Sequence, residues 1–316
     1  MSQFADILND ARWLPHAFDP ASRTLTFIQI ERERLSQPAF LADAVPAPGS
    51  QPVAVPFDVV AAAQFDEAPL HFIFHTAFCR STLLTRALEI PGLCAGLSEP
   101  GIIAKIGGAG PDVTAQVMRL LSRSWGHSAA MGADEPSEAV IVKPTNHANA
   151  LIPAIMEMRP DARAILMTNP LPSFLAAVVR KGMMGRRWGR QLYLELMGYA
   201  GLEVGMDGPE QFAMTDLQAA GLAWFLNQRY FDALTRKYGN RVRVLDGDAF
   251  GAAPGQTLTA VGAFTGLAID GARASQIASG PVFTADAKTG EDYAAKAARD
   301  AAATQSAVVE DEIAKV

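Results

Sequence analysis

The stretch that decides the fold is HFIFHTAFCRSTLLTRAL, residues 71–88. Its first four residues are apolar or aromatic and favour a β-strand, whereas Ser81 begins an amphipathic run typical of a helix. The unpaired N–H groups and positive dipole end of a helix N-terminus favour an anion. The hydroxyls of Ser81 and Thr82 and the guanidinium of Arg80 would add donors suited to phosphate. The sequence predicts a loop that binds phosphate or sulfate, and an ordinary capped helix is the alternative interpretation.

Composition narrows the class of protein. The chain has 316 residues, of which 49% are hydrophobic, so it can bury one large core or two small ones. The net charge of −6 and the lack of a long basic run argue against a nucleic-acid partner. No apolar stretch is long enough to cross a membrane, and the N-terminus does not resemble a signal peptide. Two cysteines imply no disulfide framework, so we expect a cytoplasmic protein without a membrane partner.

The order of apolar and amphipathic runs predicts the architecture. Strands are expected near residues 71, 93, 139, 162 and 242, with helices between them. This alternation predicts an α/β fold with a doubly wound parallel sheet flanked by helices. Residues 1–68 are expected to form an N-terminal extension that packs on a main domain of residues 69–316. Residues 45–56 are rich in proline, which favours an extended connector.

Polar residues follow two further predicted strands. Glu99 follows the strand near residue 93, and Lys143 and His147 follow the apolar run AVIV. The carboxyl ends of parallel strands meet at one edge of a sheet, so these side chains should face the same crevice as Ser81. Lys143 would be costly to bury without a role. By local sequence alone, Glu99 could brace the adjacent loop, and His147 could be the N-cap of the next helix.

The loop resembles a known family. FIFHTAFCRSTLL, residues 72–84, is similar to the 5′-phosphosulfate loop of sulfotransferases, whose common bacterial form reads PRSGSTLL. The chain resembles a divergent bacterial branch of that family, because Phe78 stands where the family has Arg or Lys, and Arg80 where it has Gly. The likeness implies a sulfotransferase-like fold, which is a P-loop NTPase-like one. It also implies that five loop residues hold the 5′ end of the donor, namely Thr76, Cys79, Arg80, Ser81 and Thr82. Cys79 has a second interpretation, as a buried filler or a reactive thiol.

Other segments carry the resemblance further. VKPTNH is similar to the family's KTH segment, which implies that Lys143 and His147 lie near the transferring group. TNPLPSFLA is similar to the 3′-phosphate segment, with Thr168 and Ala176 in place of its Arg and Ser. Candidate replacements are Ser173 and the cluster Arg180, Lys181, Arg186, Arg187 and Arg190, in a region where Gly182 and Gly185 suggest a mobile loop. Residues 280–293 resemble the C-terminal strap, with Lys288 as its cation.

The resemblance implies transfer of a sulfuryl group from 3′-phosphoadenosine 5′-phosphosulfate (PAPS) to a hydroxyl or amine of an unidentified small molecule or glycan. Lys143 would stabilise the bridging oxygen, and His147 or Glu99 would accept the proton. The sequence offers no metal-ligand cluster, so no metal is expected. Two alternatives stay open: a non-catalytic scaffold that binds an anion, a nucleotide or a protein, and a small-molecule kinase. The kinase is disfavoured because the loop lacks the glycines and lysine of GxxxxGK[ST].

Overall fold

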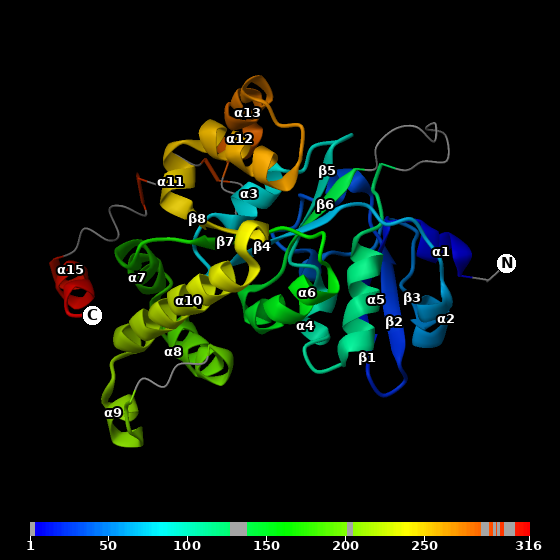
Figure 1. Cartoon of the computed structure of the whole chain (residues 1–316). Coiled ribbons are helices and arrows are strands. Elements are labelled where there is room, and N and C mark those ends of the chain that lie inside the picture. Colours follow the sequence, from blue (N-terminus) through cyan, green and yellow to red (C-terminus); the bar gives the residue numbers. More distant parts are fainter. Residues whose placement is uncertain are drawn as a thin grey trace.

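The architecture is a five-stranded parallel sheet with helices on both faces and a small antiparallel sheet at one side (Figure 1). It comes from a computed structural model that describes residues 4–126, 138–200, 205–285, 291, 292, 295, 298, 299 and 307–316. The order of the large sheet is β5-β6-β4-β7-β8. Its strands are β4 (Leu70–His75), β5 (Cys94–Ser98), β6 (Ala139–Lys143), β7 (Ala164–Thr168) and β8 (Val242–Asp246).

All four neighbouring strand pairs of this sheet are parallel. Every residue of β4, β5, β6 and β7 is buried, as expected for strands covered on both faces. The edge strand β8 is partly exposed. The predicted doubly wound parallel α/β fold is therefore confirmed.

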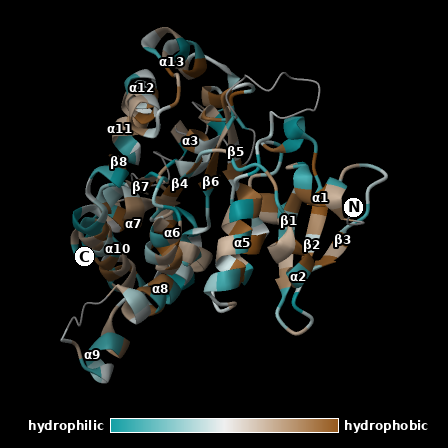
Figure 2. Cartoon of the chain, turned by 45° about the vertical axis from the view of Figure 1, so that its right-hand side comes forward, coloured by the Kyte–Doolittle hydropathy of each residue, from teal (hydrophilic) through white to brown (hydrophobic). Residues whose placement is uncertain are grey.

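Alternate residues of the central strand β4 serve the two faces of the sheet. Ile73 packs in a hydrophobic cluster with α3 (Ser81–Ala87), α12 (Pro254–Thr265) and α13 (Gly271–Ala278). Phe72 and Phe74 pack in a larger cluster with α5 (Pro111–Leu121), α6 (Ile152–Met158) and α10 (Asp216–Tyr238). Figures 1 and 2 show these two helical layers on opposite sides of strands coloured as strongly hydrophobic.

The first part of the chain forms the antiparallel sheet β1-β2-β3. Its strands are β1 (Trp13–Asp19), β2 (Thr24–Gln29) and β3 (Val53–Pro56), between α1 (Ala5–Asn9) and α2 (Phe57–Ala62). The last four residues of the Pro-rich stretch thus form a strand that pairs with β2. Residues 32–34 and 41–43 are short 3-10 helices, and α4 (Gly101–Lys105) packs on β1.

Buried Arg123 links the end of α5 to this N-terminal segment. Its guanidinium donates hydrogen bonds to five backbone carbonyl groups, those of Ile7, Leu8, Asp10, Trp13 and Leu120. Only 2% of the residue is exposed. Since each buried carbonyl needs a donor, one side chain satisfies several acceptors that no strand or helix pairs.

Helices α7 (Leu171–Arg180) and α8 (Gly182–Tyr199) correct one prediction. The segment with Gly182 and Gly185 was expected to be a mobile loop, but it is the first turn of α8. Gly185 is buried where a Cβ would overlap the carbonyl oxygen of Val178. The glycine therefore allows the two helices to approach closely.

Two short helices complete this side of the molecule. They are α9 (Gly208–Ala213) and α15 (Ala307–Ala314), and α15 is joined to α8 by the Arg186–Glu312 ion pair. Among the described helices, none has the length and apolar character needed to span a membrane.

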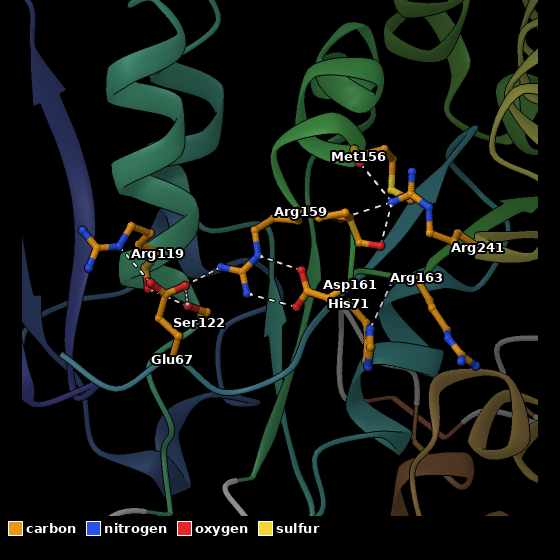
Figure 3. A network of polar contacts seen from close by, with 10 residues as sticks. Glu67, His71, Arg119, Ser122, Met156, Arg159, Asp161, Arg163 and Arg241 are labelled. Carbon is orange, nitrogen blue, oxygen red and sulfur yellow. Dashed lines mark hydrogen bonds and ion pairs between the residues drawn. The ribbon is translucent and has the colours of Figure 1, made fainter. Parts of the chain in front are cut away.

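Charged side chains fasten the amino-terminal edge of the sheet (Figure 3). Glu67, which precedes β4, accepts hydrogen bonds from Arg119 at 2.8 Å and Arg159 at 2.6 Å. Arg241, which precedes β8, donates to the carbonyl groups of Met156, Arg159 and Pro160. These contacts connect the loops that precede the strands. The candidate site lies at the opposite, carboxyl-terminal edge of the sheet.

Candidate functional site

The loop between β4 and α3 has a backbone that non-glycine residues rarely adopt. Ala77, Phe78 and Arg80 have φ angles of 70°, 58° and 62°, in the left-handed region. Each such residue costs on the order of 1–2 kcal/mol, so the surrounding structure must hold the loop in place. Strained backbone of this kind is common at functional sites.

Three contacts hold the loop. The Phe78 ring packs against Phe174 and Trp188, with ring centroids 6.1 and 5.0 Å away. The Thr76 N–H donates to the Met167 carbonyl oxygen at 3.0 Å. Behind the loop lies Gly247, where a Cβ would overlap the carbonyl oxygen of Cys79.

The loop presents donors that the described residues do not satisfy. The amides of Phe78, Cys79 and Thr82 form no hydrogen bond within the described part of the chain. The Thr76 Oγ1 is buried and also has no partner there. Buried polar groups are normally paired, so this set is suited to an anion with several oxygens. The predicted loop residues Thr76, Ser81 and Thr82 thus lie where the sequence placed them.

Cys79 is wholly buried, and its Sγ lies 3.5 Å from the Met167 carbonyl oxygen. Burial raises the pKa of this thiol above its ordinary value. A protonated, inaccessible thiol is a poor nucleophile, which favours the interpretation of Cys79 as a buried filler.

A buried charge cluster lies at the ends of three neighbouring strands. Lys143, the last residue of β6, is 0% exposed, and its ammonium group pairs with the Glu99 carboxylate. Its Nζ is also 3.3 Å from Nε2 of His75, the last residue of β4. Glu99 has a φ of 49°, and its N–H donates to the Lys143 carbonyl oxygen at 2.6 Å. The structure therefore brings together two of the three predicted catalytic residues, beside the loop between β4 and α3.

His75 was not identified from the sequence. Its Nδ1 accepts a hydrogen bond from the Ala77 N–H at 3.1 Å, and its Nε2 lies 3.1 Å from the Pro144 carbonyl oxygen. This pattern assigns the neutral tautomer with the proton on Nε2. His75 therefore ties the loop to the end of β6, and only its position as the last strand residue signals that role.

His147 lies apart from the Lys143–Glu99 pair. It is in a 3-10 helix, Asn146–Leu151, whose N-cap residue is Thr145, so the N-cap interpretation of His147 is wrong. Its Nδ1 lies 2.6 Å from Oε2 of Glu195 on α8, and 41% of its side chain is exposed. A carboxylate that accepts from Nδ1 leaves Nε2 to act as a base. Glu195 was missed because no local pattern links it to His147.

Arg80 and Ser173 converge on an acid that the sequence analysis left out of the site. Asp248, in α11 (Gly247–Ala252), accepts from Arg80 at 2.5 Å and from the Ser173 hydroxyl at 2.6 Å. Burial alone would raise the pKa of Asp248, but these two donors hold it below its ordinary value. The guanidinium of Arg80 is thus directed toward α11.

The residues at the end of β7 are already hydrogen-bonded to side chains of α10. Thr168 is 7% exposed, and its hydroxyl oxygen accepts a hydrogen bond from Gln228 of α10. The next residue, Asn169, receives the indole N–H of Trp224 on its carbonyl oxygen at 2.8 Å. Arg180 lies at the far end of α7, seven residues beyond Ser173 and therefore about 10 Å along the axis. Lys288 lies outside the described residues.

Comparisons with known proteins give several similar solved structures, two of which are described here. No protein-family model matches the chain, and no curated protein matches it. The sulfotransferase domain from the curacin biosynthetic pathway is 14% identical over 71% of this chain and 84% of its own, with a TM-score of 0.40. A sulfotransferase from Alicyclobacillus acidocaldarius is 19% identical over 78% of this chain and 97% of its own, with a TM-score of 0.37. Both likenesses concern the fold alone, and the doubly wound parallel sheet expected from the sequence is the one described above.

Proposed function

We propose that the chain is a sulfotransferase that moves a sulfuryl group from a nucleotide 5′-phosphosulfate to a hydroxyl or amine acceptor. The observation that carries the proposal is the buried cluster of Lys143, Glu99 and His75 beside the loop of residues 76–80. Sulfuryl transfer needs positioning and charge stabilisation more than covalent chemistry. A wholly buried ammonium group next to a set of unsatisfied amides is suited to that task.

The donor expected from the resemblance is PAPS, and the residues fit its two ends differently. The 5′ end fits the loop, where Thr76, Ser81, Thr82 and the free amides can bind phosphate and sulfate oxygens. The 3′-phosphate finds no such set, because Thr168 is buried beneath Gln228. We therefore assign only the 5′-phosphosulfate to named residues. The bound phosphosulfate would supply the activated sulfuryl group.

The protein residues have distinct roles in this proposal. The acceptor oxygen forms a bond to sulfur while the bond from sulfur to the bridging oxygen breaks. Lys143 stabilises the negative charge that develops on that bridging oxygen. Glu99 or His147 takes the acceptor proton. Glu99 pairs with Lys143 and lies 3.9 Å from His75 Nε2, whereas His147 is the more exposed of the two.

A non-catalytic scaffold that binds anions is the second candidate. The observation that favours it is the pairing of Arg80 with Asp248, which commits the loop's guanidinium to a protein partner. The small-molecule kinase gains no support from Asp246 and Asp248, the two acids at the end of β8, because both have structural partners. Asp246 caps α11 by accepting from the amides of Asp248 and Ala249, and Asp248 holds Arg80 and Ser173.

The test is transfer of ³⁵S from labelled PAPS and labelled adenosine 5′-phosphosulfate to a panel of alcohols, phenols, amines and sugars. Thr82→Ala should lower kcat/KM about 10- to 100-fold, because it removes a hydrogen bond to a charged group worth about 1.5–3 kcal/mol. Lys143→Met should lower kcat more than KM. The matched control Lys237→Met alters an exposed lysine of α10 and should leave both unchanged. Transfer by the wild type that Thr82→Ala and Lys143→Met leave intact would contradict the proposal.

A further inference from the structure

We propose that the donor nucleotide keeps a free ribose 3′-hydroxyl, and that Asp248 accepts a hydrogen bond from it. This inference rests on the proposed function and names the class of donor, an adenosine 5′-phosphosulfate without the 3′-phosphate. The resemblance implies a donor with a 3′-phosphate. The residues at the ends of β7 and β8 do not suit that phosphate, and the inference follows from this mismatch.

At the ends of β7 and β8, four side chains that could donate a hydrogen bond to a phosphate already have acceptors within the protein. Arg80 donates to Asp248 and to the Gly247 carbonyl oxygen, and the Ser173 hydroxyl donates to Asp248. The Gln228 amide donates to Thr168, and the Trp224 indole donates to Asn169. A phosphate at this place would have to break several of these bonds and leave their acceptors unpaired.

Two of the basic residues downstream also have acceptors within the protein. Arg186 donates two hydrogen bonds to Glu312, at 2.6 and 2.8 Å. Arg190 donates to Asp216 at 2.8 Å and to the Met214 carbonyl oxygen at 2.7 Å. Both guanidinium groups are thus committed to acceptors on α15 and at the start of α10, away from Ser173.

Asp248 has the opposite preference from a phosphate site. Its carboxylate is ionised, receives one bond on each oxygen and is 37% exposed. An ionised carboxylate has about four lone-pair sites, so it can accept further hydrogen bonds. A ribose hydroxyl can donate to these sites, whereas a phosphate dianion has no proton to give and is repelled. One side chain therefore favours the hydroxyl and disfavours the phosphate.

The position of Asp248 relative to the loop supports its contact with a bound nucleotide. The neighbouring Gly247 lies against the Cys79 carbonyl group, so the start of α11 packs directly behind the loop. Arg80, the last loop residue before α3, contacts the Asp248 carboxylate itself. A nucleotide whose 5′ end lies in the loop has its ribose within a few bonds of this contact.

The experiment is isothermal titration of three ligands into the wild type: adenosine 5′-phosphate, 3′-phosphoadenosine 5′-phosphate and 3′-deoxyadenosine 5′-phosphate. We expect adenosine 5′-phosphate to bind at least 10-fold more tightly than each of the other two. Asp248→Asn keeps the shape of the side chain and should reduce the discrimination against the 3′-phosphate about 10-fold. The control Asp232→Asn neutralises an exposed acid of α10 and should change none of the three affinities. Circular dichroism and Tm check that both variants fold.

The two proposals fail in different ways. If 3′-phosphoadenosine 5′-phosphate binds the wild type more tightly than adenosine 5′-phosphate, the inference about the donor is overturned and the proposed function stands. If Asp248→Asn leaves the ratio of the two affinities unchanged, Asp248 is not the discriminating residue and the inference is also overturned. If no nucleotide binds, the proposed function itself is overturned.

Discussion

Glu99→Gln would isolate the most deeply buried charge of the site. The change keeps the size of the side chain and an amide oxygen, but it removes the negative charge that faces Lys143. Lys143 is 0% exposed. Its ammonium group also lies near the His75 Nε2, which itself carries a proton, and 5.4 Å from the centroid of the Phe40 ring, and neither of these neighbours carries a negative charge.

Breaking a buried ion pair from one side costs about 3–5 kcal/mol, because a charge is left buried without its partner. We therefore expect Glu99→Gln to lower the free energy of unfolding by about 3–5 kcal/mol in urea titrations followed by circular dichroism. Lys143→Met should cost less, because Glu99 is 18% exposed and can be hydrated. The double variant should be more stable than Glu99→Gln alone. A loss below about 1 kcal/mol for Glu99→Gln would refute the argument that this pair is desolvated.

Three further changes test other parts of the structure. Burial, with the charge of Arg163, lowers the pKa of His71 from 6.5 to about 4, so the unfolded chain takes up the proton first as the pH falls. Stability should decrease by up to ~3 kcal/mol between pH 6.5 and pH 4, and His71→Asn should reduce this slope; equal slopes in urea titrations would contradict the burial of His71. Arg123→Met removes the donor shared by five carbonyl groups and should cost at least about 3 kcal/mol in the same assay; a loss under 1 kcal/mol would show that water replaces the guanidinium. Gly247→Ala places a methyl group against the Cys79 carbonyl and should weaken nucleotide binding in titration calorimetry, whereas Gly271→Ala, which has open space, should not; equal affinities would contradict the close packing of α11 on the loop.

The large sheet could be predicted because its strands are local apolar runs. AVIV and the run that contains FIF stand out from flanking polar residues, and they became β6 and β4. The strands β1 and β3 were not predicted. Pro15 and His16 interrupt the first, and Pro52 and Pro56 flank or end the second, so tertiary pairing with β2 outweighs local preference.

Only the part of the candidate site that depends on sheet topology could be predicted from the sequence. The positions of Glu99 and Lys143 follow from the ends of neighbouring parallel strands. Their partners do not, because His75 is 68 residues from Lys143 and Asp248 is 168 residues from Arg80. No periodicity or motif reports such pairings. The direction of the Arg80 side chain depends on these partners, and so it could not be deduced from the loop sequence.

The central claim is that the loop of residues 76–82 binds the 5′ end of a nucleotide. Titration calorimetry with adenosine 5′-phosphate tests it most directly, with wild type compared with Ser81→Ala/Thr82→Ala. Loss of two hydrogen bonds to a charged phosphate should weaken binding by about 3–6 kcal/mol, or at least 100-fold. Tight binding by the wild type that the double variant loses is the predicted result. Equal affinity for the two proteins would contradict the assignment of the loop.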